Sequence, residues 1–175
     1  LDGDAPNIAY LGSVSKTLAP GLRFGWMYAA ASVIEATVIA KQSADLHTST
    51  LVQYVVASIL ADDRWYRDHL AQVQAHYRHQ AGYMADAIEA TFGDDVEFLR
   101  PTGGMFLWLR HRGAIDTSAL LATALESGVA FVPGAAFAVD ADLRQHLRLS
   151  YATASDEQID TGMKLLYEVI AAALA

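Results

Sequence analysis

The chain has 175 residues, of which 53% are hydrophobic, and this is enough to bury a substantial core in one large domain or two small ones. Its 12 basic and 20 acidic residues give a net charge of −8, which argues against nucleic acid as a partner of this portion because such a surface repels phosphate backbones. The absence of cysteine excludes disulfides and thiolate chemistry and favours a reducing compartment, so we expect a cytoplasmic protein.

The beginning of the chain predicts a piece of a longer protein. The first residues, Leu1-Asp2-Gly3-Asp4, include no initiator methionine, no basic start and no apolar region of a secretory signal. We therefore expect the chain to begin within a domain. No apolar run approaches the ~18 residues needed to cross a bilayer, so no membrane partner is expected.

Two strands are predicted near the N-terminus. Residues 8–11 form a short apolar run that ends at Gly12, as in a buried strand. Residues 22–28 are rich in aromatics, and their alternation would place Leu22, Phe24 and Trp26 on one face of a second strand. Pro20-Gly21 marks a turn between the two strands.

Three helices should follow, over residues 33–40, 50–60 and 65–91. The third would end at Gly93, with Trp65 and Tyr77 in a core. At 1.5 Å per residue it would be ~40 Å long, more than one compact domain needs. We therefore expect it to connect two domains, 1–80 and 81–175.

The second half of the chain alternates strands and helices, which is typical of an α/β fold. The expected strands cover residues 96–99, 105–109, 129–132 and 147–151. Asp116 could cap a helix that ends at Gly128. Ser155 and Gln158 have the spacing of a capping box before a last helix.

The segment from Gly12 to Gly25 combines two serine hydroxyls, an amine and a guanidinium. Lys16 and Arg23 are seven residues apart, an extended reach of ~25 Å, and the turn at Pro20-Gly21 could fold that reach back so that both cations share one site. Two neighbouring cations favour an anion between them, and a phosphate bound by Ser13, Ser15 and Arg23 would suit this arrangement. A partly buried Lys16 could then act as a neutral amine and form a Schiff base with an aldehyde that carries the phosphate. The alternative is a surface lysine in a hairpin.

This Ser-x-Ser-Lys segment, followed by Pro-Gly-x-Arg-x-Gly, resembles the cofactor segment of the fold-type I aminotransferases of class I and II. These enzymes use pyridoxal 5′-phosphate (PLP). The resemblance implies that Ser13, Ser15, Lys16 and Arg23 bind the cofactor, with the two serines and Arg23 at its phosphate. It also implies that Lys16 is the catalytic residue, which holds the cofactor as a Schiff base and moves the proton between the substrate Cα and the cofactor C4′.

Four segments further along the chain resemble the same family, and look closest to its 2-aminoadipate and kynurenine aminotransferase branch. These segments are residues 41–50, 100–109, 129–134 and 147–152. The resemblance implies an α/β chain that is the C-terminal half of such an enzyme. Residues 1–80 would close the large PLP-binding domain, a mixed sheet with helices, and residues 81–175 would form the small C-terminal domain. The family also implies a homodimer.

Arg148 is the predicted substrate-binding residue. Its neighbours Leu147 and Leu149 would face the other side of a strand, so the guanidinium would project alone from an apolar element. A bidentate clamp on a substrate carboxylate fits that position, and the family uses the matching arginine in this way. The alternative is an arginine on an exposed edge strand, paired with Asp142 or Glu157.

Other candidate features have weaker readings. Gly103-Gly104 would be a loop on the substrate side, or a plain hairpin turn, and Gly134 has the same two readings. His47 is expected to form local hydrogen bonds in a loop. His76 and His79 are three residues apart on the long helix with no carboxylate at ligand spacing, so we expect a solvated face and no metal site.

The family places several cofactor contacts upstream of Leu1, including an aromatic ring and an aspartate for the pyridine ring. The isolated chain is therefore expected to have no transaminase activity. The leading function is a transaminase that moves an amino group from an amino acid to a 2-oxo acid. An alternative is the PLP-binding effector domain of a MocR-type (GntR family) transcription regulator. A third is another reaction of the same lysine-bound cofactor, such as β-elimination or decarboxylation.

Overall fold

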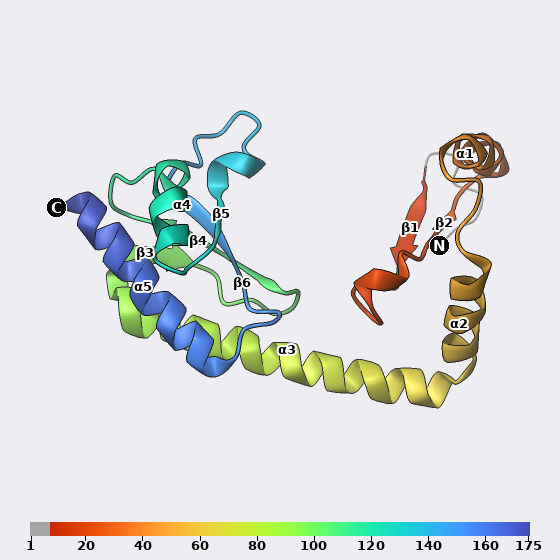
Figure 1. Cartoon of the computed structure of the whole chain (residues 1–175), viewed down its shortest axis with the longest axis horizontal. Coiled ribbons are helices and arrows are strands. Elements are labelled where there is room, and N and C mark those ends of the chain that lie inside the picture. The colour runs from red at the N-terminus through yellow and green to blue at the C-terminus, as the bar shows by residue number, and fades with distance from the viewer. Residues whose placement is uncertain (1–7) are drawn as a thin grey trace. The chain divides into compact units, whose positions relative to one another are not determined.

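The computed structural model describes residues 8–175, and the chain divides into two compact units, Leu1–Val73 and Gln74–Ala175. The colours of Figure 1 follow the residue numbers through both. Among the helices of residues 8–175, none is both long enough and apolar enough for a transmembrane span.

The first unit begins with an antiparallel pair of strands, β1 (Tyr10–Ser13) and β2 (Gly25–Tyr28), in which Ser13 lies opposite Gly25. Both predicted strands exist, but within the described chain the first is not buried as predicted, since Leu11 is 68% exposed, and the second starts three residues later than expected. The cause is a short 3₁₀ turn at Pro20–Leu22, after which Arg23 takes a left-handed conformation with φ 49°. Extended alternation is therefore impossible before Phe24, and the predicted common face that included Leu22 is wrong.

The three predicted helices are confirmed as α1 (Ala31–Ala44), α2 (Thr50–Ala61) and α3 (Asp63–Phe92). The 30 residues of α3 correspond to about 45 Å of helix. Gly93 follows with φ +51°, a left-handed value that glycine adopts without strain and that ends the helix.

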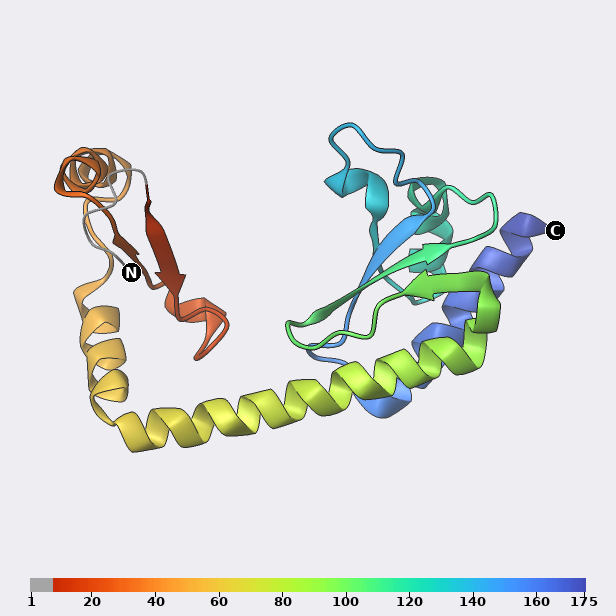
Figure 2. The same ribbon diagram turned by 180° about the vertical axis from the view of Figure 1, so that it is seen from behind.

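The second unit contains a four-stranded antiparallel sheet in the order β3-β4-β6-β5. Its strands and its two further helices are β3 (Val96–Phe98), β4 (Phe106–His111), β5 (Val132–Pro133), β6 (His146–Ser150), α4 (Thr117–Glu126) and α5 (Asp156–Leu174). Short 3₁₀ turns lie at Gly93–Asp95 and Gly134–Phe137. Figure 2 shows the same chain from behind.

One face of this sheet forms the core. Leu107 pairs with Leu149, and Leu109 with Leu147, and all four side chains are buried. They share one hydrophobic cluster with residues of α3, α4 and α5, so these helices cover the same face. The opposite face carries Phe106 and other exposed or half-buried side chains of β4 and β6. Tyr77 packs against the core as predicted, but Trp65 is 48% exposed, so its predicted core position is wrong.

The predicted caps are confirmed. The Asp116 carboxylate accepts the backbone N–H groups of Ser118 and Ala119, and Ser155 and Gln158 form the reciprocal capping box of α5. The strand predicted over residues 129–132 is mostly wrong, because Val132 and Pro133 alone pair with β6.

Candidate active site

The turn between β1 and β2 brings the two predicted serines together. The Oγ atoms of Ser13 and Ser15 are 3.0 Å apart, and Ser13 Oγ also accepts the backbone N–H of Ser15 at 3.1 Å. Ser13 Oγ lies 3.2 Å from the carbonyl oxygen of Phe24, on the returning arm of the turn. Since a hydroxyl has one proton, Ser13 donates to either Ser15 or Phe24. The hydroxyl proton of Ser15 and lone pairs of both serine oxygens then remain available to bind a ligand.

Arg23 and Lys16 occupy the same turn and project into solvent. Arg23 donates from Nη1 to the carbonyl of Pro20 at 3.2 Å and keeps its other guanidinium donors free of ion pairs among residues 8–175. Within residues 8–175 Lys16 is exposed, so this part of the chain does not itself supply the partial burial that was predicted. In its described part the unit fully buries only Val14 and Val56.

The composition of the turn suits a phosphate. Residues 13–24 contain Lys16, Arg23 and the hydroxyls of Ser13, Ser15 and Thr17 but no Asp or Glu, so no carboxylate of this segment competes for the two cations. A dianionic phosphate would therefore be attracted by charge and by hydroxyl donors. The residues present fit the phosphate of PLP, and the Lys16 amine fits its aldehyde.

A contact that the sequence reasoning missed reaches this turn from α3. The Nε2 atom of His69 lies 2.9 Å from the carbonyl oxygen of Thr17, the residue directly after Lys16. The indole of Trp65 stacks on the His69 ring, with centroids 5.1 Å apart and planes inclined by 6°. Because 52 residues separate His69 from Thr17, no local pattern could have revealed the contact.

Arg148 lies on β6, on the open face of the sheet in the second unit. Its Cζ atom is 4.0 Å from the ring centroid of Phe106 and 4.9 Å from that of Phe137, so two aromatic faces support the guanidinium. The described residues offer it no ion pair, since Asp142 binds Arg144 instead. The alternative of an edge strand is wrong, because β6 lies between β4 and β5.

The remaining candidates have structural roles. Gly104 has φ +86°, which favours glycine, and the preceding carbonyl of Gly103 accepts the Tyr151 hydroxyl at 3.3 Å. His47 Nδ1 lies 2.8 Å from the adjacent carbonyl of Thr48, the local contact that was expected. His79 contacts Asp156 at 3.1 Å, and within residues 8–175 no three His, Asp or Glu side chains gather as metal ligands would.

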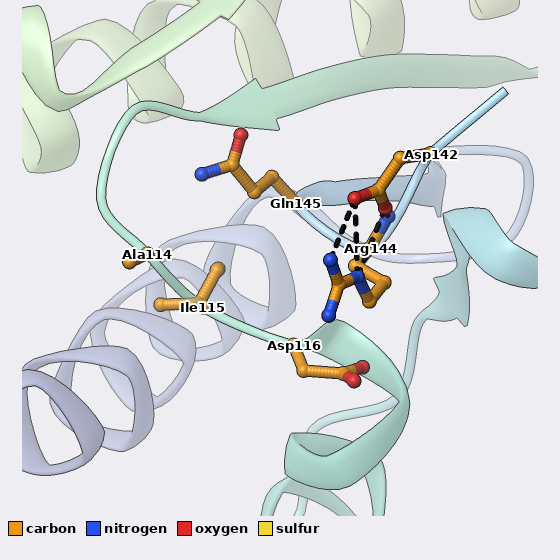
Figure 3. Close-up of a pocket in the computed structure, with 6 residues that line it drawn as sticks. All are labelled: Ala114, Ile115, Asp116, Asp142, Arg144 and Gln145. Atoms are coloured by element: carbon orange, nitrogen blue, oxygen red, sulfur yellow. Dashed lines mark hydrogen bonds and ion pairs between the residues drawn. The ribbon is translucent and has the colours of Figure 1, made fainter.

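A cavity of about 460 Å³ in the second unit is a weaker candidate for a ligand site (Figure 3). Its lining consists of Ala114, Ile115, Asp116, Asp142, Arg144 and Gln145. Arg144 binds both carboxylate oxygens of Asp142, and these hydrogen bonds lower the pKa of Asp142 to about 2. The Asp116 carboxylate is already used to cap α4. The charges of Asp142 and Arg144 neutralise each other and one oxygen of Asp116 caps the helix, so the cavity offers a ligand few polar groups beyond the second Asp116 oxygen.

With this fold and these sites, the chain matches the family of class I and II aminotransferases over residues 1–166, and it belongs to that family. Members of the family use PLP, and the predicted α/β fold class and cofactor are confirmed.

The relatives place the chain in the 2-aminoadipate branch. It is 38% identical to the 2-aminoadipate transaminase of Thermus thermophilus over 170 residues, which is 97% of this chain and 42% of that protein. A crystal structure of α-aminoadipate aminotransferase from Thermus thermophilus, in complex with N-(5′-phosphopyridoxyl)-L-leucine, superimposes with a TM-score of 0.88 at 38% identity, over 97% of this chain and 43% of that one. The chain spans about two fifths of the length of these enzymes.

Regulators are also among the relatives. The HTH-type transcriptional regulator YisV of Bacillus subtilis, itself uncharacterized, is 32% identical over 93% of this chain and 33% of its own length.

Proposed function

We propose that the protein carrying this chain is a PLP-dependent aminotransferase that moves an amino group from an amino acid to a 2-oxo acid. The observation that carries this proposal is the turn between β1 and β2, where two neighbouring serine hydroxyls and two cations stand together without a carboxylate. Membership of the aminotransferase family supports the same conclusion.

Each candidate residue has a distinct task. Ser13, Ser15 and Arg23 bind the cofactor phosphate and so fix the position of the cofactor ring. Lys16 holds the cofactor by its amine and carries the proton to and from the substrate Cα. When bound, the cofactor withdraws the electron pair left at Cα. Arg148 holds the carboxylate of either substrate with its N–H fork.

The assembly that we propose is a homodimer, with residues 1–80 in the large PLP-binding domain and 81–175 in the small domain. Fourteen of the twenty-two large apolar side chains that are exposed in residues 8–175 lie before residue 74, among them Leu51 and Tyr54 of α2, and we expect the rest of the large domain and a second copy of the protein to cover this surface between them. A cytoplasmic location is consistent with the lack of cysteine.

The decisive variant is Lys16→Ala in the full-length protein, with Lys164→Ala as the matched control, since Lys164 is also exposed. Lys16→Ala should abolish the absorbance band of covalently held PLP and the transfer of amino groups to 2-oxoglutarate, whereas Lys164→Ala should preserve both. A Lys16→Ala protein that retains the band would refute the assignment.

A second candidate function is favoured by the similarity to YisV. In that case the same turn would bind PLP as a sensed ligand in a transcription regulator. A full-length protein that carries a DNA-binding helix–turn–helix and shows no turnover with any amino acid would support this function over the first.

A further inference from the structure

The Lys16 turn has few contacts with the rest of its unit. Its backbone hydrogen bonds are local, such as those from Thr17 and Leu18 to the carbonyl of Val14, or they close the hairpin, as from Val14 N–H to the Phe24 carbonyl. Among the described residues, His69 alone provides a hydrogen bond to residues 14–22 from outside the β1–β2 hairpin. His69 is therefore a side chain that can restrain the orientation of the turn from outside the hairpin.

The geometry fixes the direction of this hydrogen bond. A carbonyl oxygen can only accept, so His69 Nε2 carries the proton and donates to Thr17. The stacked Trp65 ring limits rotation of the imidazole and keeps Nε2 directed at the turn. The pair thus forms an anchor on α3 for the peptide group that joins Lys16 to Thr17.

We propose that His69 is a positioning residue for Lys16, supported by Trp65. The proposal rests on the proposed role of Lys16 as the cofactor lysine. Covalent capture joins the Lys16 nitrogen to the aldehyde carbon of PLP and releases the aldehyde oxygen as water, so its rate depends on how often the amine occupies the reactive position. Without the His69 anchor the turn samples more conformations, and capture becomes slower.

Three variants separate the hydrogen bond from the stacking. His69→Phe keeps an aromatic ring against Trp65 but has no donor. His69→Gln keeps a donor at the position of Nε2 but loses the ring. His69→Ala loses both. His76→Ala is the control, because His76 is exposed on the same helix and makes no hydrogen bond within residues 8–175.

The measurements use the full-length protein freed of its cofactor. Loss of one hydrogen bond of this kind should slow PLP capture by roughly two- to tenfold in His69→Ala and His69→Phe, and should raise amide exchange over residues 14–24 by a similar factor. Affinity for pyridoxamine 5′-phosphate, which has no aldehyde and so reports on the noncovalent contacts alone, should fall by a clearly smaller factor than the capture rate, because it does not depend on the position of the Lys16 amine. His69→Gln and His76→Ala should behave as the wild type in all three measurements.

The outcomes distinguish this inference from the proposed function. If Lys16→Ala still captures PLP, the proposed function itself fails. If Lys16→Ala abolishes capture but His69→Phe matches the wild type, or His69→Gln is as slow as His69→Ala, the anchor is disproved and the function stands. Equal loss of pyridoxamine 5′-phosphate affinity and capture rate would also disprove it, because it would indicate general damage to the fold.

Discussion

Replacing Arg148 or the aromatic rings that support it tests the proposed substrate site most directly. A bidentate hydrogen bond to a carboxylate contributes about 1.5–3 kcal/mol, so Arg148→Lys, which keeps the charge but loses the planar fork, should lower kcat/KM for amino acids by roughly 10- to 100-fold. Each aromatic contact, at 4.0 Å from Phe106 and 4.9 Å from Phe137, contributes about 0.5–1 kcal/mol at an exposed site. Phe106→Leu and Phe137→Leu should therefore each reduce kcat/KM by roughly two- to fivefold.

The assay compares two substrates in single-turnover reactions of the full-length protein. One is an amino acid that the protein accepts, and the other is the corresponding amine, which lacks the α-carboxylate. Because Arg148 has no task in binding the amine, the variants should affect its reaction by less than about twofold. The reasoning is refuted if the amine and the amino acid lose reactivity equally.

Three further predictions concern the second unit. The Leu147 side chain is 0% exposed, so Leu147→Ala should lower the free energy of unfolding, measured by urea denaturation, by about 3 kcal/mol. Leu99 is 90% exposed, so Leu99→Ala should change this free energy by less than about 0.5 kcal/mol. Similar effects at both sites would contradict the core described for this unit. The pKa of Asp142 is about 2 in the folded state and 3.8 ordinarily, so its contribution to stability is present above about pH 4 and is lost as the pH falls towards 2. In an NMR titration, Arg144→Met should raise this pKa towards 3.8. An unchanged pKa would contradict the ion pair. Asp116→Ala should cost about 1 kcal/mol of unfolding free energy through loss of the α4 cap, and an unchanged urea midpoint would show that the cap is not stabilising.

The helices and their caps could be predicted because their determinants are local. Asp116 and the Ser155–Gln158 pair each act within one turn of the helix that they begin, so a few consecutive residues suffice to identify them. The strands were less predictable, because a strand exists only where a partner pairs with it. Residues 129–131 have the composition of a strand, yet pairing with β6 starts only at Val132.

The candidate sites show the same division. The motif around Lys16 and the position of Arg148 between two core leucines are visible in the sequence. The contacts that hold these residues in place are not visible in the sequence. His69 contacts Thr17 across 52 positions, and Phe137 contacts Arg148 from a 3₁₀ turn outside the strand. Trp65 was assigned to a core by its helical spacing, but spacing gives a face of a helix and not what covers that face.

The two units therefore hold their candidate site residues in place by different means. Arg148 lies on a strand whose neighbours, Leu147 and Leu149, belong to a continuous hydrophobic core, so the fold of the second unit itself holds the guanidinium in place. Among residues 8–175, the Lys16 turn buries Val14 and receives the His69 hydrogen bond from outside the hairpin, so these two contacts contribute to its geometry. Core substitutions around Arg148 should consequently change stability first, whereas substitutions at His69 should change the reactivity of Lys16 while leaving the rest of the fold intact.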